Sequence, residues 1–290
     1  MSAPHETSRV WLITGSSRGL GRSFAEAVLE AGHRLVATAR KPEQLVALVE
    51  RYGDRVRAVA LDVTNPEQAR AAVRTAVDAF GRLDVVVNNA GYGNLAPIEQ
   101  VTDEDFRSQL DTNLFGVMNV TRAALPVLRQ QRSGHVIQVS SVGGRLSTPG
   151  LGAYQAAKWA VGGFSEVLAK EVAPFGVKVT VLEPGGFRTD WAGASMTIAD
   201  FLPEYAPTVG VVARNLRSRT GKEAGDPKRA AQVLLQVAAM EQPPLHLVLG
   251  SDAFELSQQK LDALKAEDQT WKALSLSTDF PDAHAPAPRS

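Results

Sequence analysis

The chain has 290 residues, of which 44% are hydrophobic and 21% charged, as is usual for a globular protein. Its 31 basic and 31 acidic side chains balance, which argues against nucleic acid or an anionic membrane surface as a partner. The absence of cysteine excludes disulfides and thiolate chemistry, and the five histidines lack metal-ligand spacing, so we expect no metal site.

Short β-branched apolar runs alternate with segments of helical period along the chain. They predict strands at 10–14, 34–39, 56–61, 83–88, 135–140, 178–183 and 245–249. Most of these runs are apolar throughout, as strands covered on both faces must be. The pattern predicts an α/β fold of three layers, doubly wound, with a mainly parallel seven-stranded sheet and helices on both faces.

Two of the predicted helices have clear boundaries. The segment 21–32 places Phe24, Val28 and Ala31 on one face and ends at a glycine. The segment 65–80 begins with Asn65 as a cap, followed by a proline at the first helical position.

No linker or change of composition interrupts the pattern, so we predict a single domain over 1–290. Segment 187–225 is rich in Gly, Pro and Thr, and we interpret it as a substrate lid in which glycines and prolines prevent a long helix. Segment 279–290 has the composition of a disordered tail. No apolar run has the length of a membrane helix, and no signal peptide precedes the first strand, so we expect a cytoplasmic protein.

The first predicted strand leads into the turn T-G-S-S-R-G-L-G at 14–21, and a predicted helix follows directly. Glycines permit a tight turn and close approach of a pyrophosphate, and the helix N-terminus offers N–H groups to an anion. No lysine follows the glycines, which argues against phosphoryl transfer. A glycine-rich turn without a ligand is the alternative, and the place of the turn in the first strand–helix unit favours a nucleotide.

Tyr154 and Lys158 are four residues apart, on one face of a predicted helix. Reduction of a carbonyl by hydride requires a proton donor, and a nearby cation makes a tyrosine acidic enough for that role. The pattern Y-x-x-x-K is common by chance, and a tyrosine and lysine that match it by chance have only a structural role. Here Ser141 ends the fifth predicted strand, at the sheet edge where such folds bind ligands. Asn113 is a polar residue in an otherwise apolar predicted helix, which favours a functional role. The alternative is that its side chain faces solvent.

With these motifs the chain resembles the short-chain dehydrogenase/reductase family. The resemblance covers about residues 10–189 and includes T-G-x-x-x-G-x-G at 14–21, N-N-A-G at 88–91, Y-x-x-x-K at 154–158 and P-G at 184–185. It implies a Rossmann fold and an NADP(H)-dependent oxidoreductase acting on a small carbonyl or alcohol substrate. It also implies a homodimer or homotetramer, formed through the long helices around Asn113 and after Tyr154.

The resemblance also implies the roles of individual residues. Tyr154 is the general acid or base, Lys158 lowers its pKa, Ser141 holds the substrate oxygen, and Asn113 holds a water linked to Lys158. The implied coenzyme-binding residues are Gly15, Ser17, Arg18, Gly19, Leu20, Arg40, Asp62, Val63, Asn88, Ala90, Gly91, Tyr154, Lys158, Pro184, Gly185 and Thr189.

The coenzyme preference follows from the end of the second predicted strand. No carboxylate stands there, whereas Arg40 and Arg18 could grip the 2′-phosphate of NADP(H). Two solvated surface arginines are the alternative. Asp62 could contact the adenine or instead cap the next turn.

The substrate is not named by the sequence. Apolar and aromatic side chains in the lid are typical of a site for an apolar or aromatic carbonyl compound, but a lid must also pack on its own protein. The basic side chains at 214–229 indicate a solvated face more than a site for an acidic substrate. Alternatives are a non-catalytic NADP(H)-binding regulator on the same fold, or an epimerase or dehydratase.

Overall fold

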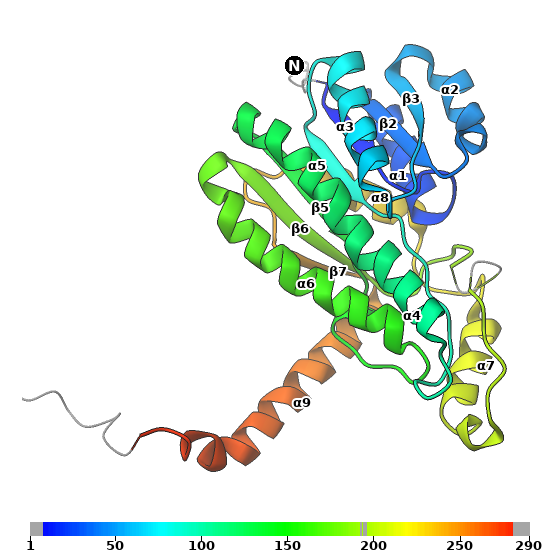
Figure 1. Ribbon diagram of the computed structural model, residues 1–290, viewed down its shortest axis with the longest axis vertical. Helices are drawn as coiled ribbons and strands as arrows, with labels where there is room; N and C mark the ends of the chain where they lie inside the picture. Colours follow the sequence, from blue (N-terminus) through cyan, green and yellow to red (C-terminus); the bar gives the residue numbers. More distant parts are fainter. Residues whose placement is uncertain (1–7, 192, 194–195, 281–290) are drawn as a thin grey trace, which may run out of the picture.

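A computed structural model gives the structure of the protein, described here for residues 8–191, 193 and 196–280. Seven parallel strands form one sheet in the order β3-β2-β1-β4-β5-β6-β7 (Figure 1). The strands are β1 (Val10–Ile13), β2 (Arg34–Ala39), β3 (Val56–Ala60), β4 (Val85–Asn88), β5 (Gly134–Val139), β6 (Val177–Pro184) and β7 (His246–Leu249). All seven predicted strands are confirmed, with ends that agree to within two residues.

Both faces of the sheet are covered, which explains the continuous apolar strands. In β1, Trp11 and Ile13 enter one core while Val10 and Leu12 enter the other. The predicted doubly wound, three-layer architecture is therefore confirmed.

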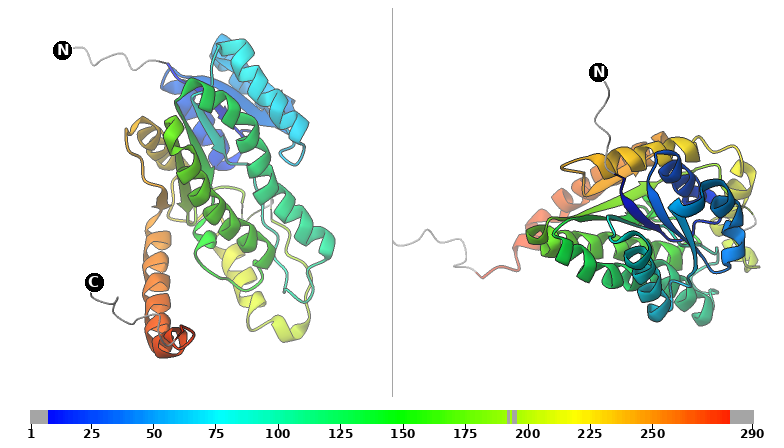
Figure 2. Two further views of the ribbon diagram at one scale, coloured as in Figure 1. Left: turned by 60° about the vertical axis from the view of Figure 1, so that its left-hand side comes forward. Right: turned by 90° about the horizontal axis from the view of Figure 1, so that it is seen from above.

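The helices divide between these two cores (Figure 2). Helices α1, α2 and α8 supply residues to the first core, and α3, α5 and α6 supply residues to the second. The α-helices are α1 (Gly19–Glu30), α2 (Val46–Tyr52), α3 (Pro66–Phe80), α4 (Asp103–Leu110), α5 (Gly116–Gln131), α6 (Gly152–Val172), α7 (Val209–Arg219), α8 (Pro227–Ala239) and α9 (Ser251–Leu276). None of the helices in the described part of the chain has the length and hydrophobicity needed to span a membrane.

The predicted helix boundaries match the local chemistry. The side chain of Asn65 accepts the backbone N–H groups of Glu67 and Gln68 at 2.9 and 3.2 Å, capping α3 as expected. Beyond α1, Gly32 has a φ of +87°, which a glycine adopts without strain.

Two helical segments were not expected from the sequence. Segment 187–225, whose glycines and prolines we expected to prevent a long helix, contains the regular helix α7 of 11 residues, with Gly210 inside it. Gly210 is tolerated because it occupies the first turn and lies against the ring of Phe201, where a Cβ would be 3.4 Å from the ring atoms. Helix α9 was not predicted. The suggested tail at 279–290 lies outside the described residues from 281 onward.

Candidate functional site

The site lies where β1, β4, β5 and β6 end, at the carboxyl edge of the sheet. The strand order reverses between β1 and β4, because β2 follows β1 on one side and β4 pairs with it on the other. Ligands of doubly wound sheets bind outside the strand ends at such a switch point. The topology therefore brings the predicted motifs to one edge.

The glycine turn after β1 is a tight backbone cradle. Gly15 and Gly19 have φ values of +68° and +57°. A Cβ on Gly21 would lie 2.2 Å from the carbonyl oxygen of Gly15, so only glycine fits there. This close packing leads directly into the N-terminus of α1, where free N–H groups can receive an anion.

The N-N-A-G segment fixes this cradle to β4. The Asn89 amide donates to the carbonyl oxygens of Thr14 and Gly15 at 2.9 and 3.2 Å. The Thr14 hydroxyl accepts the backbone N–H groups of Asn89 and Ala90, both at 2.9 Å. The side chain of Asn88 lies in the sheet, where its amide donates to Thr121 and Gln138 at 3.0 and 2.8 Å. Asn88 therefore organises the sheet with its side chain.

The predicted coenzyme-selecting arginines lie at the rim of the site. Arg18 precedes α1 in extended conformation, Arg40 follows β2, and both side chains are exposed. One carboxylate oxygen of Asp62 accepts the backbone N–H and the hydroxyl of Thr64 at 2.9 and 2.8 Å. The side chain of Asp62 thus makes the turn contact that was its alternative role.

The predicted catalytic residues are gathered by α6 and β5. Tyr154 and Lys158 both lie on the buried face of α6, 6% and 3% exposed. The Lys158 ammonium is 5.7 Å from the centroid of the Tyr154 ring and donates to the carbonyl oxygen of Val139 at 2.9 Å. Ser141 follows β5 and accepts the backbone N–H of Gly143 at 3.0 Å.

Burial controls the titration of this pair. It raises the pKa of Tyr154 to about 12, and a hydrogen bond with Ser141 acts in the opposite direction. Burial lowers the pKa of Lys158 to about 8. Both shifts favour the uncharged forms. In this buried, low-dielectric environment a charge on one of the two groups interacts strongly with a charge on the other.

Asn113 is fully buried, which makes the solvent-facing alternative wrong. It lies in a π-helical turn (Asp111–Phe115) between α4 and α5, a distortion often found at functional sites. Its amide donates to the carbonyl oxygens of Tyr92 and Gln109 at 2.8 and 2.9 Å, and its oxygen accepts the Tyr92 N–H. A Cβ on Gly91 would be 2.5 Å from that oxygen and 3.5 Å from the Lys158 nitrogen. The chain at Gly91 thus lies against both Asn113 and Lys158.

The P-G turn after β6 forms the opposite wall. The backbone N–H of Gly186 donates to the carboxylate of Asp252, in the first turn of α9, at 2.9 Å. A Cβ on Gly185 would be 2.5 Å from the same carboxylate, which explains the glycine. Thr189 lies beside Gly19, since a Cβ on that glycine would be 3.7 Å from the Thr189 side chain. The predicted phosphate turn and the predicted coenzyme-binding residue Thr189 therefore lie next to one another.

The segment after Thr189 lies over Tyr154. Trp191 packs on Tyr154, with ring centroids 5.2 Å apart. Farther along, Ile198 forms an isolated parallel bridge with Leu95, whose N–H donates to the Thr197 carbonyl oxygen at 2.9 Å. Met196, Val209 and Ala213 of this segment form a small separate core with Leu95 and Leu151. The predicted lid thus packs its own apolar side chains against Leu95 and Leu151.

Sequence reasoning missed a buried ionic group behind Ser141. Glu183, on β6, is 3% exposed and pairs with Arg145 at 2.6 Å and with His246 at 3.1 Å. The outer nitrogen of His246 lies 3.2 Å from Glu166 of α6. The one available signal was a carboxylate at the end of an apolar strand. Through Arg145 this group fixes the loop that follows Ser141.

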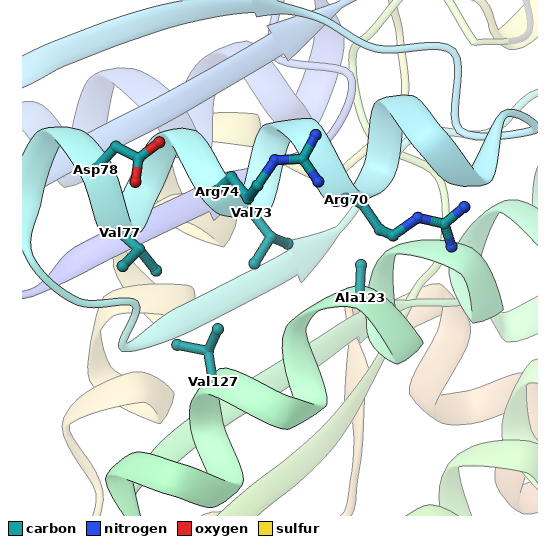
Figure 3. A pocket seen from close by; sticks show the side chains of 7 residues that line it. All are labelled: Arg70, Val73, Arg74, Val77, Asp78, Ala123 and Val127. Atoms are coloured by element: carbon teal, nitrogen blue, oxygen red, sulfur yellow. The ribbon is translucent and has the colours of Figure 1, made fainter.

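Two surface hollows lie apart from these residues. One, of about 260 Å³, lies between α3 and α5 and is lined by Arg70, Val73, Arg74, Val77, Asp78, Ala123 and Val127 (Figure 3). The other, of about 550 Å³, lies at the start of α8 and includes Arg188, Lys228 and Arg229. All six basic residues at 214–229 are exposed.

Known proteins resemble the chain over most of its length. The profile for short chain dehydrogenases matches residues 9–197. Oxidoreductase BOA17 of Botryotinia fuckeliana is 53% identical over 272 residues, covering 93% of this chain and 99% of that protein.

Solved structures agree with this assignment. A short-chain dehydrogenase from Streptomyces avermitilis superposes with a TM-score of 0.89 at 41% identity, covering 94% of this chain and 100% of the other. An alcohol dehydrogenase from Thermococcus sibiricus, complexed with 5-hydroxy-NADP, has a TM-score of 0.69 at 26% identity, covering 83% and 96%. The chain is an oxidoreductase of the short-chain dehydrogenase/reductase family, which binds nicotinamide cofactors.

Proposed function

We propose that the protein transfers hydride between NADP(H) and a carbonyl or alcohol substrate, acting as a ketone or aldehyde reductase or as a secondary alcohol dehydrogenase. The observation that carries this proposal is the placement of Tyr154, Lys158 and Ser141 beside the glycine cradle at the switch point of the sheet. A proton donor, a cation and a hydroxyl in one buried site are what carbonyl reduction needs from a protein.

The glycine turn fits a dinucleotide. The collision that a Cβ at Gly21 would make shows how closely the backbone is folded there, and the start of α1 offers N–H groups to a pyrophosphate. Gly15, Ser17, Gly19 and Leu20 would hold that part of the coenzyme. On the opposite wall, Pro184, Gly185 and Thr189 would contact the nicotinamide end.

The exposed guanidinium groups of Arg18 and Arg40 support NADP(H) over NAD(H), because a 2′-phosphate adds a dianion that they can bind. The Thermococcus sibiricus relative carries an NADP derivative, which supports the same preference. Asp62, Val63, Asn88, Ala90 and Gly91 would border the adenosine side through backbone and side-chain contacts.

The side chains of the site then perform the proton transfer. NADP(H), when bound, supplies or accepts the hydride. Tyr154 gives its phenolic proton to the substrate oxygen in reduction and takes a proton from the alcohol in oxidation. Ser141 donates a hydrogen bond to the same oxygen, and the Lys158 ammonium stabilises the phenolate that Tyr154 becomes. Asn113 positions the chain at Gly91 beside Lys158.

In this proposal the substrate lies beside Trp191 and the apolar core that the predicted lid forms with Leu95 and Leu151. We infer an apolar or aromatic carbonyl compound, because such a site offers contact area and few polar partners. We also propose a homodimer or homotetramer through α5 and α6, since α6 exposes the large apolar side chains of Trp159 and Val167.

Following NADPH absorbance with a panel of aldehydes, ketones and quinones tests the activity, and Tyr154→Phe tests the mechanism. The variant should bind NADPH as the wild type does but lose about 10²- to 10⁴-fold in turnover, since the ring remains and the proton donor is gone. Near-normal turnover in the variant would exclude Tyr154 as the acid. NADPH binding without turnover of any compound in the panel would favour a regulator.

A further inference from the structure

The segment 91–95, which follows β4, connects Asn113 to the predicted lid. At one end, the backbone N–H of Tyr92 donates to the Asn113 side-chain oxygen at 3.2 Å, and the Tyr92 carbonyl oxygen accepts the Asn113 amide at 2.8 Å. At the other end, the Leu95 N–H donates to the carbonyl oxygen of Thr197 at 2.9 Å. A short stretch of backbone therefore joins the buried Asn113 to the lid.

The middle of this segment lies against the aromatic rings of the site. Gly93 packs on both Tyr154 and Trp191, since a Cβ at this glycine would be 3.1 Å from each ring. A displacement of segment 91–95 therefore changes the space beside the Tyr154 phenol. In the function proposed above, the substrate carbonyl must reach that space.

Asn94 holds this segment from two sides with one side chain. Its oxygen accepts the backbone N–H of Thr197 in the lid at 3.1 Å. Its amide nitrogen donates to the carboxylate of Asp105, on α4, at 2.7 Å. The backbone N–H can only donate and the carboxylate accepts, so the two partners fix the orientation of the amide. Through this one side chain the lid is tied to α4.

Gln109 carries the connection from Asp105 to Asn113. It is 1% exposed, and its amide donates to the second carboxylate oxygen of Asp105 at 2.9 Å. Its side-chain oxygen accepts the backbone N–H of Asn94 at 3.0 Å, and its carbonyl oxygen accepts the Asn113 amide at 2.9 Å. A buried polar network in which each member has its partners favours one geometry. The lid is thus held in a fixed place relative to Asn113.

We propose that Asn94 and Asp105 are positioning residues for the reaction, which set the room for the substrate by fixing the lid at Thr197 relative to Tyr154. This inference rests on the function proposed above, because it concerns the substrate side of the same site. The pair acts on the substrate through the lid and segment 91–95. Its loss should therefore affect substrate binding more than the chemical step or the binding of coenzyme.

Exchanging the two side chains tests the pair. Asn94→Asp alone brings two carboxylates to the 2.7 Å contact, and their repulsion should turn the side chain at position 94 away from both partners. The KM for an aromatic ketone should then rise about tenfold, the value of one lost hydrogen bond, with kcat and the KM for NADPH nearly unchanged.

The double variant Asn94→Asp/Asp105→Asn should restore the wild-type KM. The new amide at position 105 donates to the new carboxylate at position 94 and accepts from Gln109, so donor and acceptor are exchanged and every hydrogen bond is kept. An unchanged KM in Asn94→Asp, or a KM that stays raised in the double variant, overturns the proposal.

Gln131→Glu is the matched control for the change from amide to carboxylate. The Gln131 amide donates to the carbonyl oxygen of Leu83 at 2.6 Å, before the start of β4 and at the edge of the sheet opposite the site. The variant should lose stability and keep the wild-type KM. A rise in KM equal to that of Asn94→Asp would show a general loss of structure and would contradict the positioning role.

Hydrogen exchange of the Thr197 amide tests the tie without any activity. Asn94→Leu has a side chain of similar shape with no polar atoms, and it should speed this exchange at least about tenfold in the coenzyme-free protein. Gln131→Glu should not. This measurement stands even if no ketone is turned over, an outcome that would count against the proposed function alone. Unchanged exchange at Thr197 in Asn94→Leu overturns the positioning role even if the protein is an active reductase.

Discussion

The indole of Trp191 lies against the phenol ring of Tyr154, with centroids 5.2 Å apart and planes tilted by 54°. Gly93 packs closely against both rings, because a Cβ at this position would be 3.1 Å from each of them. Trp191 contributes to the burial of the tyrosine, and burial is the main cause of its raised pKa. One aromatic side chain thus influences both access to Tyr154 and its acidity.

Replacing Trp191 by alanine should weaken the binding of aromatic ketones. We expect KM to rise about tenfold, the value of one lost aromatic contact, with a smaller change in Trp191→Phe. Steady-state kinetics on a ketone series measures the effect. An unchanged KM in Trp191→Ala would mean that this indole does not contact the substrate.

Removing the guanidinium of Arg40 should weaken NADPH binding by about ten- to hundredfold and leave NADH binding nearly unchanged. Arg51→Ala is the matched control, because Arg51 is an exposed arginine on α2 that pairs with Glu30. Fluorescence titration with both coenzymes measures the affinities. Equal wild-type affinities for NADPH and NADH would contradict the assigned preference.

The buried carboxylate of Glu183 should contribute strongly to stability. Glu183→Gln removes the charge that faces Arg145 and His246, and we expect a loss of about 3 kcal/mol in the free energy of unfolding. Glu166→Gln removes a half-exposed partner of the same histidine and should cost under about 1 kcal/mol. Urea denaturation measures the loss of stability in each variant. Equal losses would show that the buried carboxylate of Glu183 contributes no more to stability than the half-exposed Glu166.

The sheet could be predicted almost entirely from the sequence, because seven apolar runs must be covered on both faces. The predicted catalytic residues also converge, since parallel strands and the following loops end at one edge. Helix α9 could not be predicted in this way. Its large apolar side chains are exposed and share no packing partner among the described residues, so their spacing is not tied to the sheet. The ionic pair of Arg145 and Glu183 depends on tertiary contact between the loop after β5 and the strand β6, and it likewise leaves little trace in sequence.

The predicted lid should become more ordered when coenzyme binds. Its backbone is held at Ile198 by the bridge to Leu95 and at Phe187 by a bridge to Gly225. We expect the amides of Leu95 and Ala199 to exchange faster than those of β4, and to slow when NADPH is added. Hydrogen exchange with and without NADPH measures this. High protection without coenzyme, unchanged by its addition, would mean that the segment is a fixed wall.

Acid should destabilise the protein through His135. This side chain is 3% exposed, and burial lowers its pKa to about 3. The Thr180 hydroxyl donates to the Pro244 carbonyl oxygen at 2.8 Å, so it accepts from Nε2 of His135 at 2.9 Å. The ring is then neutral, and its Nδ1 is buried without a hydrogen-bond partner among the described residues, so a second proton there would have no acceptor.

The sign of the effect follows from linkage. Between pH 6.5 and about 3 the unfolded chain binds a proton at His135 that the folded protein does not, so stability falls as pH falls through this window. At pH 5 the loss from this one group is about 2 kcal/mol. His246 acts in the opposite direction, because the hydrogen bond with Glu183 raises its pKa. Its contribution is the same in the wild type and in a variant at His135, so it cancels when the two proteins are compared. His135→Gln keeps a donor for Thr180 and should lose about 2 kcal/mol less than the wild type between pH 7 and pH 5 in urea denaturation. An identical loss in both proteins would show that another group controls acid unfolding.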